Sequence, residues 1–572
     1  MQQNPKTLAA LLIGIAFLAS CTKTNKQGRL IPTEASVVFI MNGQSLTDKL
    51  PWNEVKQNAA FIKMNGDTSV PAFIKKIADN PDNAGIDIKN NVSIFMVNDS
   101  SGMYVGIEGI VKDADKFRLF NLDLTKNGFE ADKGSFKTIT SYPLIVGYNK
   151  DRFVYIIDKH TSAGAPIITD STMPAVPKVN TTSSRDLAGT CESVFNLSEK
   201  NSLGENERFT TLVKKKGDIY CWVNIEQMQK ANFKGTMGAG SLFNMDKLYE
   251  GNVTAGTINF DNGRINVDMV SYASKEMTAI WKKYEGSAFN TDMVKSLPSK
   301  QVAAIFAMNF KPEAIRQMVN TMNMEGIINL GLSFAGITMD DFIKANKGDF
   351  LFAATDIKSV ADTTSKGNIV PAHRARMSVK PDILFVTSIG DKDAMNNLIK
   401  AGKKMAGNNM GDSTQSPVSY NSNGKYVAIS NSKEKADQYL AGGNNSFEFL
   451  DKMSGKPFGG FIDFQYVMKS MAPNVAGDSS KQAAYDASVK MWDNLYYKGG
   501  NFTDGGIAHT IEVNLVDKNT NSLKQLNQYA AIMALLHHDR KDKNEVKQAT
   551  RTDNRMDTMV SVKPIGHIGH KK

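Results

Sequence analysis

Cysteine is nearly absent from this chain of 572 residues, which contains three cysteines, four tryptophans and seven histidines. So few thiols exclude a fold held by a disulfide framework and a multi-cysteine zinc site. The sequence also lacks His-Glu-x-x-His, Gly-x-Ser-x-Gly and Gly-Lys-Ser/Thr, which mark zinc proteases, serine hydrolases and phosphate-binding loops. We therefore predict no catalytic residues, no metal site and no cofactor.

An apolar leader stands at the start of the sequence. It has a polar start with Lys6, an apolar run over residues 8–19, and the ending Leu18-Ala19-Ser20-Cys21. About 20 apolar residues are needed to cross a bilayer, so this shorter run predicts a removable signal peptide over residues 1–20. The ending resembles the bacterial lipobox, which implies cleavage before Cys21 and acylation of that residue. An ordinary secretory signal with a cysteine nearby is the alternative.

The segment after the leader, residues 21–30, is polar and aperiodic, so we expect a tether behind the lipid. Thr22 stands where enteric lipoproteins carry the aspartate that retains them at the inner membrane. An acidic surface-export signal is missing as well. These features predict a protein attached to the outer membrane through lipid on Cys21 and facing the periplasm.

The formal net charge is +10, with 22% charged and 41% hydrophobic residues, which is an ordinary balance for a globular protein. The basic residues do not form a stripe interleaved with aromatic residues, so we predict no nucleic-acid partner. Residues 536–572 are polar, basic and aperiodic and are predicted to be a disordered tail.

Two long stretches of the body resemble each other. Each has a Pro-containing start, an apolar strand that ends at Asn, and a later hairpin. These features lie at residues 31–42 and 144–157 and recur at residues 297–309 and 418–429. Matches in the same order over so much of the chain indicate an internal duplication, with one lobe over residues 31–290 and a second over residues 295–535.

Strands come in hairpins, with helices between groups of strands rather than after every strand. This pattern predicts the α+β class, with two tandem related lobes built on antiparallel sheets with packed helices. Three irregular segments, residues 160–185, 359–380 and 407–416, are predicted to be loops.

Two cysteines remain once Cys21 is acylated. Cys191 follows an irregular segment and Cys221 lies in a predicted strand. The oxidising periplasm permits a disulfide between them, and a buried free thiol at Cys221 is the alternative. Four of the seven histidines lie in or beside the basic tail without carboxylate or thiol partners, which favours a solvated tail over a metal site.

The lipobox at Cys21, the short tether, the Ile31-Pro32 start with a strand ending in Asn42, and the duplicated α+β body form a combined pattern. This pattern resembles an uncharacterised family of Bacteroidetes-type lipoproteins of unknown function. The resemblance covers nearly the whole chain and implies no catalytic residues.

Two functions fit these observations. The first is a non-enzymatic binding module of the cell envelope, anchored at Cys21, whose partner is an envelope protein, a peptide or a glycan. The alternative is a periplasmic hydrolase whose carboxylates are brought together only by the fold. The absence of acid–base and nucleophile motifs favours the first.

Overall fold

The computed structural model describes residues 27–59, 61–62, 75, 80–99, 101–126, 128–159, 185–233, 249–362, 364–365, 368–369, 376–405, 418–475 and 479–536. The chain divides into two compact units. The first unit comprises Met1–Gln44, Pro81–Met237 and Gly251–Thr257, and the second comprises Ser45–Asn80, Gly238–Glu250 and Ile258–Lys572.

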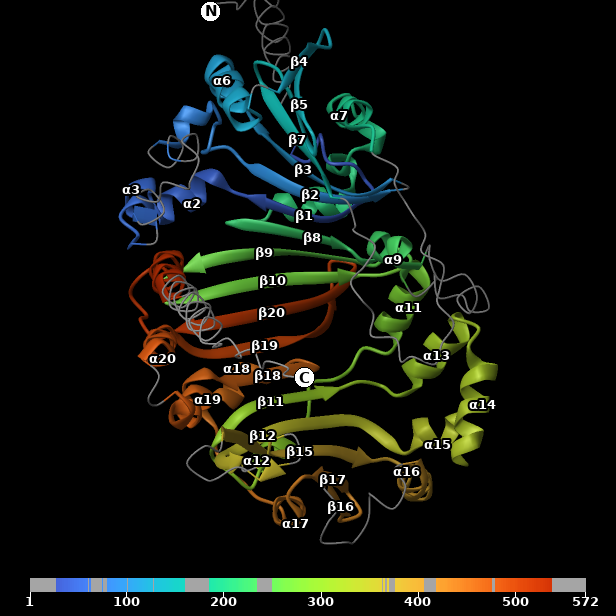
Figure 1. Cartoon of the computed structure of the whole chain (residues 1–572). Helices are drawn as coiled ribbons and strands as arrows, with labels where there is room; N and C mark the ends of the chain where they lie inside the picture. Colours follow the sequence, from blue (N-terminus) through green and yellow to red (C-terminus); the bar gives the residue numbers. More distant parts are fainter. Residues whose placement is uncertain are drawn as a thin grey trace, which may run out of the picture. The chain divides into compact units, whose positions relative to one another are not determined.

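Eight strands in the described part of the first unit form an antiparallel sheet with the order β4-β5-β6-β7-β3-β2-β1-β8 (Figure 1). The strands are β1 (Ala35–Met41), β2 (Val92–Asp99), β3 (Gly102–Ile110), β4 (Phe129–Asp132), β5 (Lys137–Ser141), β6 (Leu144–Tyr148), β7 (Arg152–Lys159) and β8 (Ile219–Asn224). Burial alternates along them, because neighbouring side chains of a strand point to opposite faces. In β1, for example, Val38 and Ile40 are buried and Phe39 is exposed.

Helices cover both faces of this sheet. The helices are α6 (Ala114–Leu124), α7 (Leu187–Phe195), α8 (Glu207–Val213) and α9 (Ile225–Phe233), with 3-10 turns at Pro81–Ala84, Glu199–Asn201 and Leu203–Glu205. Phe117 of α6 packs on Tyr148 of β6, whereas Cys191 of α7 lies against Gly147 of the same strand. Adjacent strand residues face opposite ways, so α6 and α7 lie on opposite faces of β6 (Figure 1).

The second unit contains an antiparallel sheet with the strand order β10-β20-β19-β18-β11-β12-β15-β17-β16. The strands are β10 (Arg264–Tyr272), β11 (Val302–Asn309), β12 (Asn346–Asp362), β15 (Arg376–Ile389), β16 (Ser419–Ser422), β17 (Tyr426–Ser430), β18 (Phe458–Asp463), β19 (Trp492–Thr503) and β20 (Gly506–Leu515). A short ladder joins β13 (Thr364–Ser365) and β14 (Asn368–Ile369). Strand β9 (Val253–Asp261), which begins in the first unit, pairs with β10.

Helices of the second unit pack on its sheet and on one another. They are α3 (Trp52–Lys56), α11 (Lys275–Lys283), α12 (Thr291–Lys295), α13 (Glu313–Thr321), α14 (Glu325–Ala335), α15 (Met339–Lys344), α16 (Lys392–Met405), α17 (Lys433–Ala441), α18 (Glu448–Met453), α19 (Phe464–Met471), α20 (Ser479–Met491) and residues 522–536; α2 (Gly43–Lys49) begins in the first unit. Within the described residues, no helix combines the length and the apolar character needed to cross a bilayer.

The two stretches predicted to be copies use the same strand pairings. In the first stretch β1 lies between β2 and β8, and β3 lies between β2 and β7. In the second stretch β11 lies between β12 and β18, and β15 lies between β12 and β17. Chance resemblance between sequences does not account for a repeated order of pairing.

Irregularities recur as well as regular pairings. The β1–β2 ladder has a bulge between Ala35 and Val37, and the β11–β12 ladder has one between Val302 and Ala304, at the same point of the strand. Bulges are specific features rather than random defects. These matches support the duplication, which stays a prediction.

Division into compact units does not follow the predicted lobe boundary at residues 290–295. Strand β10 and helix α11, both in the predicted first lobe, belong to the second unit. The reason is that β10 pairs with β20 over eight residue pairs, from Arg264–Asn514 to Ser271–Ile507.

The predicted α+β class with antiparallel sheets and packed helices is confirmed. The prediction of a loop over residues 359–380 is wrong at both ends. Strand β12 continues to Asp362 and β15 begins at Arg376, and these two residues pair with each other. The sequence of this segment lacks apolar alternation. Its pairing continues the β12–β15 ladder, whose register is already set by buried apolar pairs such as Leu351–Val386.

Candidate functional site

A cavity of about 320 Å³ lies in the first unit, beside β3. It is lined by the turn at residues 27–30, by Asn42, Gln44, Lys89, Asn90 and Asn91, by Glu108 to Ile110 of β3, and by Arg152 of β7. The volume is at the lower end of the range for small-molecule sites. Most of these side chains are amides or carry charge, so the cavity suits a small polar ligand.

Glu108 lies in the wall of this cavity, and its side chain is buried, with the residue only 9% exposed. Burial raises the pKa of its carboxyl to about 7, against the opposing effects of hydrogen bonds from the Ser93 hydroxyl and the Leu30 amide and of the nearby guanidinium groups of Arg152 and Arg29. Near neutral pH this carboxyl therefore exchanges a proton, which ordinary glutamates do not.

A turn over residues 27–30 closes one side of the cavity. Gly28 takes a left-handed conformation with φ of 79°, which suits glycine and brings Gln27 to the sheet. The side-chain amide of Gln27 donates to the Ser93 hydroxyl at 3.1 Å and accepts from Asn91 at 2.7 Å. These four residues were predicted to be the end of a tether, and instead they form a folded turn in which Leu30 is buried.

The same position in the second stretch is apolar. Ser93 of β2 pairs directly with Glu108 of β3, and at the same distance from the bulge Leu351 of β12 pairs with Val386 of β15. Both Leu351 and Val386 are fully buried in the large core cluster of the second unit. The fold therefore does not need a buried carboxyl at this position.

The raised pKa of Glu108 predicts a pH dependence of stability. Its carboxyl has a pKa of about 7 in the folded chain against 4.5 for the ordinary group, so between these values the unfolded chain loses the proton first. Stability from this group is therefore lost as pH rises through this window, by about 3 kcal/mol at about 1.4 kcal/mol per pKa unit.

We expect Glu108→Gln to remove this pH dependence, because the glutamine does not titrate. As pH rises from about 4.5 to 8, the free energy of unfolding, measured in urea, should fall by about 3 kcal/mol more in the wild type than in the variant. Parallel pH profiles for the two proteins would contradict the assignment.

A second cavity, of about 570 Å³, lies on the sheet of the second unit. Its cations are Arg264, Lys452, Lys456 and Lys498, and it also contains His509. The His509 ring bonds to the Tyr497 hydroxyl at 2.7 Å, and burial lowers the pKa of the ring. The Tyr497 hydroxyl therefore satisfies His509. Arg264, Lys452 and Lys456 are exposed to solvent, so we consider this cavity a weaker candidate than the one beside Glu108.

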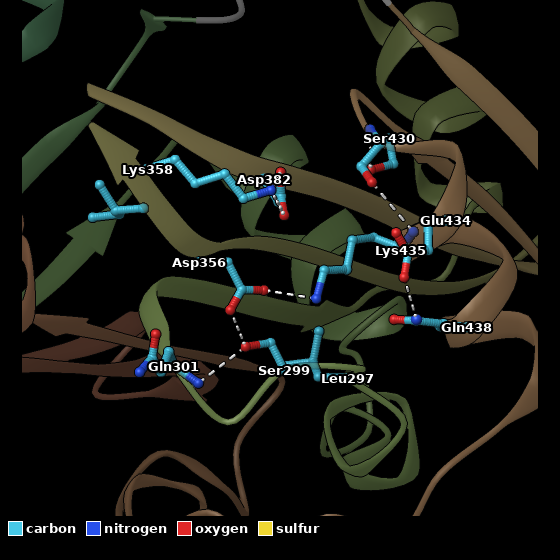
Figure 2. A network of polar contacts seen from close by, with 12 residues as sticks. Leu297, Ser299, Gln301, Asp356, Lys358, Asp382, Ser430, Glu434, Lys435 and Gln438 are labelled. Atoms are coloured by element: carbon cyan, nitrogen blue, oxygen red, sulfur yellow. Dashed lines mark hydrogen bonds and ion pairs between the residues drawn. The ribbon is translucent and has the colours of Figure 1, made fainter. Parts of the chain in front are cut away.

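Charged networks at the corners of the sheets are structural. Figure 2 shows one in the second unit, where Asp356 binds the Ser299 hydroxyl at 2.7 Å and the ammonium group of Lys435 at 2.9 Å. Lys358 pairs with Asp382 nearby at 3.1 Å. Both Asp356 and Asp382 have a lysine partner. These ion pairs join β12, β15 and α17, so we interpret them as structural.

The residues predicted from sequence do not meet in this site. Cys21 and the tail from residue 537 lie outside the described residues. Cys191 in α7 and Cys221 in β8 are both free thiols in the structure, and burial raises their pKa values to about 12 and about 11. The disulfide between them therefore gains no support from the structure and stays a prediction.

Sequence reasoning missed Glu108, Ser93, Arg29 and Arg152. One signal for Glu108 was available, because Tyr104, Gly106 and Glu108 alternate along β3 and share its buried face. A glutamate in phase with buried positions is unusual. The arginines carried no such signal, since only the fold brings them to β3.

Comparisons with known proteins give little functional information. A family model for a domain of unknown function matches residues 28–412, and no curated protein matches the chain. Crystal forms I, III and IV of TP0453 are similar over 44%, 46% and 42% of this chain and 81%, 88% and 80% of theirs. Their identities are 10%, 10% and 11% and their TM-scores are 0.25, 0.25 and 0.23, too low to carry an argument.

Proposed function

The chain belongs to the family described as a domain of unknown function (DUF4836), and because that family brings no activity with it, we propose from the residues themselves that it is an envelope-anchored binding protein. In this proposal Cys21 carries the lipid, the body faces the periplasm from the outer membrane, and the first unit takes a small polar ligand in the cavity beside Glu108.

One observation carries the binding role. The ionisable side chain of Glu108 is buried and lines the cavity, and it pairs across the sheet with Ser93 at a position that the second unit fills with Val386 and Leu351. Burying a carboxyl costs free energy that an apolar pair at this position avoids. Such a costly group beside a cavity is typical of a functional site.

A catalytic role finds less support. Hydrolysis of glycosides with two carboxyl groups requires both in one site, about 5 to 10 Å apart. Among the residues that line this cavity, Glu108 is the only carboxyl. We therefore favour binding over the hydrolase that the sequence left open.

The test compares the wild type with Cys21→Ala and with the double variant Ser93→Leu/Glu108→Val. The double variant carries the apolar pair that the second unit already accommodates, so we expect it to fold. Each protein is labelled with palmitate in cells, fractionated, extracted in detergent and denatured, and the released small molecules are identified by mass spectrometry.

We expect the wild type to take up the label, to fractionate with the outer membrane and to release a small polar compound. Cys21→Ala should take up no label, and Ser93→Leu/Glu108→Val should be labelled but release no compound. Lys498→Met, in the second cavity, is the control and should match the wild type. Release of the same compounds from the double variant, or of none from the wild type, would contradict the binding role.

A further inference from the structure

The cavity beside Glu108 holds more positive charge than its single carboxyl balances. Its charged lining consists of Arg29, Lys89 and Arg152 against Glu108. Lys89 and Arg29 make no side-chain hydrogen bond or ion pair with another described residue, and the Nη1 atom of Arg29 is buried without a partner. A buried donor without an acceptor destabilises the folded chain, so an acceptor from outside the chain would be stabilised here.

Arg152 adds to this excess. Its guanidinium stacks over the Phe195 ring at 4.9 Å and donates one hydrogen bond to the Phe195 carbonyl. Burial, together with the charge of Arg29, lowers the pKa of Arg152. Two guanidinium groups thus repel each other beside one buried carboxyl, and an anion between them would relieve that repulsion. Guanidinium groups bind carboxylates and phosphates particularly well, through paired hydrogen bonds.

We propose that the ligand of this cavity is a small molecule bearing a carboxylate or phosphate group, which binds between Arg29 and Arg152 while Glu108 takes up a proton. This proposal rests on the binding role proposed above and names the ligand class for that site. The fit of one small anion also agrees with a cavity of about 320 Å³.

Proton uptake follows from the position of Glu108. An arriving anion places a second negative charge beside the carboxylate, which favours the neutral acid. The neutral acid has an O–H that can donate to the anion, whereas the carboxylate can only accept. The groups acting on Glu108 are the Ser93 hydroxyl of β2, the Leu30 amide, and the guanidinium groups of Arg152 and Arg29. Lys89 lines the same cavity. Burial brings the pKa of Glu108 to about 7, so Glu108 is the group that exchanges the proton near neutral pH.

Binding of simple probes to the full-length protein in detergent tests the proposal. The probes are acetate, sulfate and inorganic phosphate as anions, glucose as a neutral molecule and ethanolamine as a cation, each measured by titration calorimetry. Acetate and sulfate keep their charge between about pH 6 and pH 8, so any pH dependence of their binding comes from the protein. Acetate stands for carboxylate ligands, and sulfate and phosphate stand for phosphate ligands, so their relative affinities distinguish the two sources.

We expect an anion to bind about tenfold more tightly at pH 6 than at pH 8, as a carboxyl with a pKa midway between them requires when binding protonates it. Glu108→Gln, which mimics the neutral acid, should keep the binding and lose its pH dependence. Arg29→Met should weaken binding at least about tenfold. Arg29→Lys, which keeps the charge and loses the paired donors, should fall between, and Lys498→Met should leave binding unchanged. Thermal melts establish that each variant is folded.

Two outcomes would overturn the proposed ligand class and leave standing the proposal that the cavity binds a small molecule. In the first, glucose or ethanolamine binds as tightly as the anions. In the second, anion binding persists in Arg29→Met and Arg29→Lys. Failure of every anion to bind also overturns it, and the mass-spectrometric comparison with Ser93→Leu/Glu108→Val then decides independently whether the cavity binds any small molecule.

Discussion

Replacement of Arg185 by methionine is expected to destabilise the first unit by about 3 to 5 kcal/mol, the usual effect of removing one partner of a buried ion pair. The guanidinium of Arg185 bonds to Asp158 at 3.1 Å, and both side chains are only 2% exposed. It also bonds twice to Asp99, at 2.5 and 2.8 Å, and once to the Gly102 carbonyl at 3.1 Å. Without Arg185 the buried Asp158 carboxylate loses this guanidinium.

A matched control separates burial from simple loss of charge. Arg118 also makes a paired contact with a carboxylate, that of Glu130, but its side chain is 40% exposed. Arg118→Met should cost much less than Arg185→Met, because solvent screens an exposed ion pair. Urea unfolding followed by circular dichroism measures both changes. Adding Asp158→Asn to Arg185→Met should recover a large part of the loss, and equal losses for the two arginines would contradict this account.

Truncation of Phe117 to alanine is expected to cost a similar amount, about 3 to 5 kcal/mol, as for other large aromatic residues in cores. Phe117 is fully buried, and its ring lies 5.0 Å from Phe153, 5.4 Å from Tyr148 and 6.0 Å from Tyr155. Alanine would leave a cavity at the point where α6 contacts the sheet.

The control for Phe117→Ala comes from the same helix. Leu119 of α6 is 60% exposed, so Leu119→Ala should change stability by no more than about 0.5 kcal/mol. Thermal and urea unfolding of both variants measure the difference. A small effect of Phe117→Ala would mean that α6 contributes little to the core of the first unit.

The two units differ in how they pair charged side chains at one corner of the sheet. At the corner where Arg185 lies, the second unit has the separate pairs Asp356–Lys435 and Asp382–Lys358 (Figure 2). In the first unit Asp99 and Asp158 both pair with the same residue, Arg185. Both ion pairs at this corner therefore depend on one buried arginine, and the same unit contains the buried carboxyl of Glu108. Its polar interior is consistent with the role in binding that we propose for it.

Local patterns in the sequence were sufficient for the class of the fold and for much of its course. The hairpin of β6 and β7, the strand β1, which ends one residue before the expected Asn42, and the strand β11, which ends at Asn309, were predictable. Alternation of apolar residues and turn residues are properties of neighbouring positions. Recurrence of the same order of elements predicted the shared pairing pattern. The cellular location of the protein, which we inferred from the leader ending at Cys21, also rests on sequence alone and stays a prediction.

Only the tertiary structure brought the candidate site together. Arg29, Glu108 and Arg152 are spread over more than a hundred residues, and the pairing of β3 with β7 together with the turn at residues 27–30 places them around one cavity. The raised pKa of Glu108 likewise comes from burial, which depends on residues distant in the sequence. Its contrast with Val386 required the register of both sheets, because only the ladders show that the two residues occupy matching positions. Periodicity determines which residues form strands, whereas the register of distant strands determines which of them share a cavity.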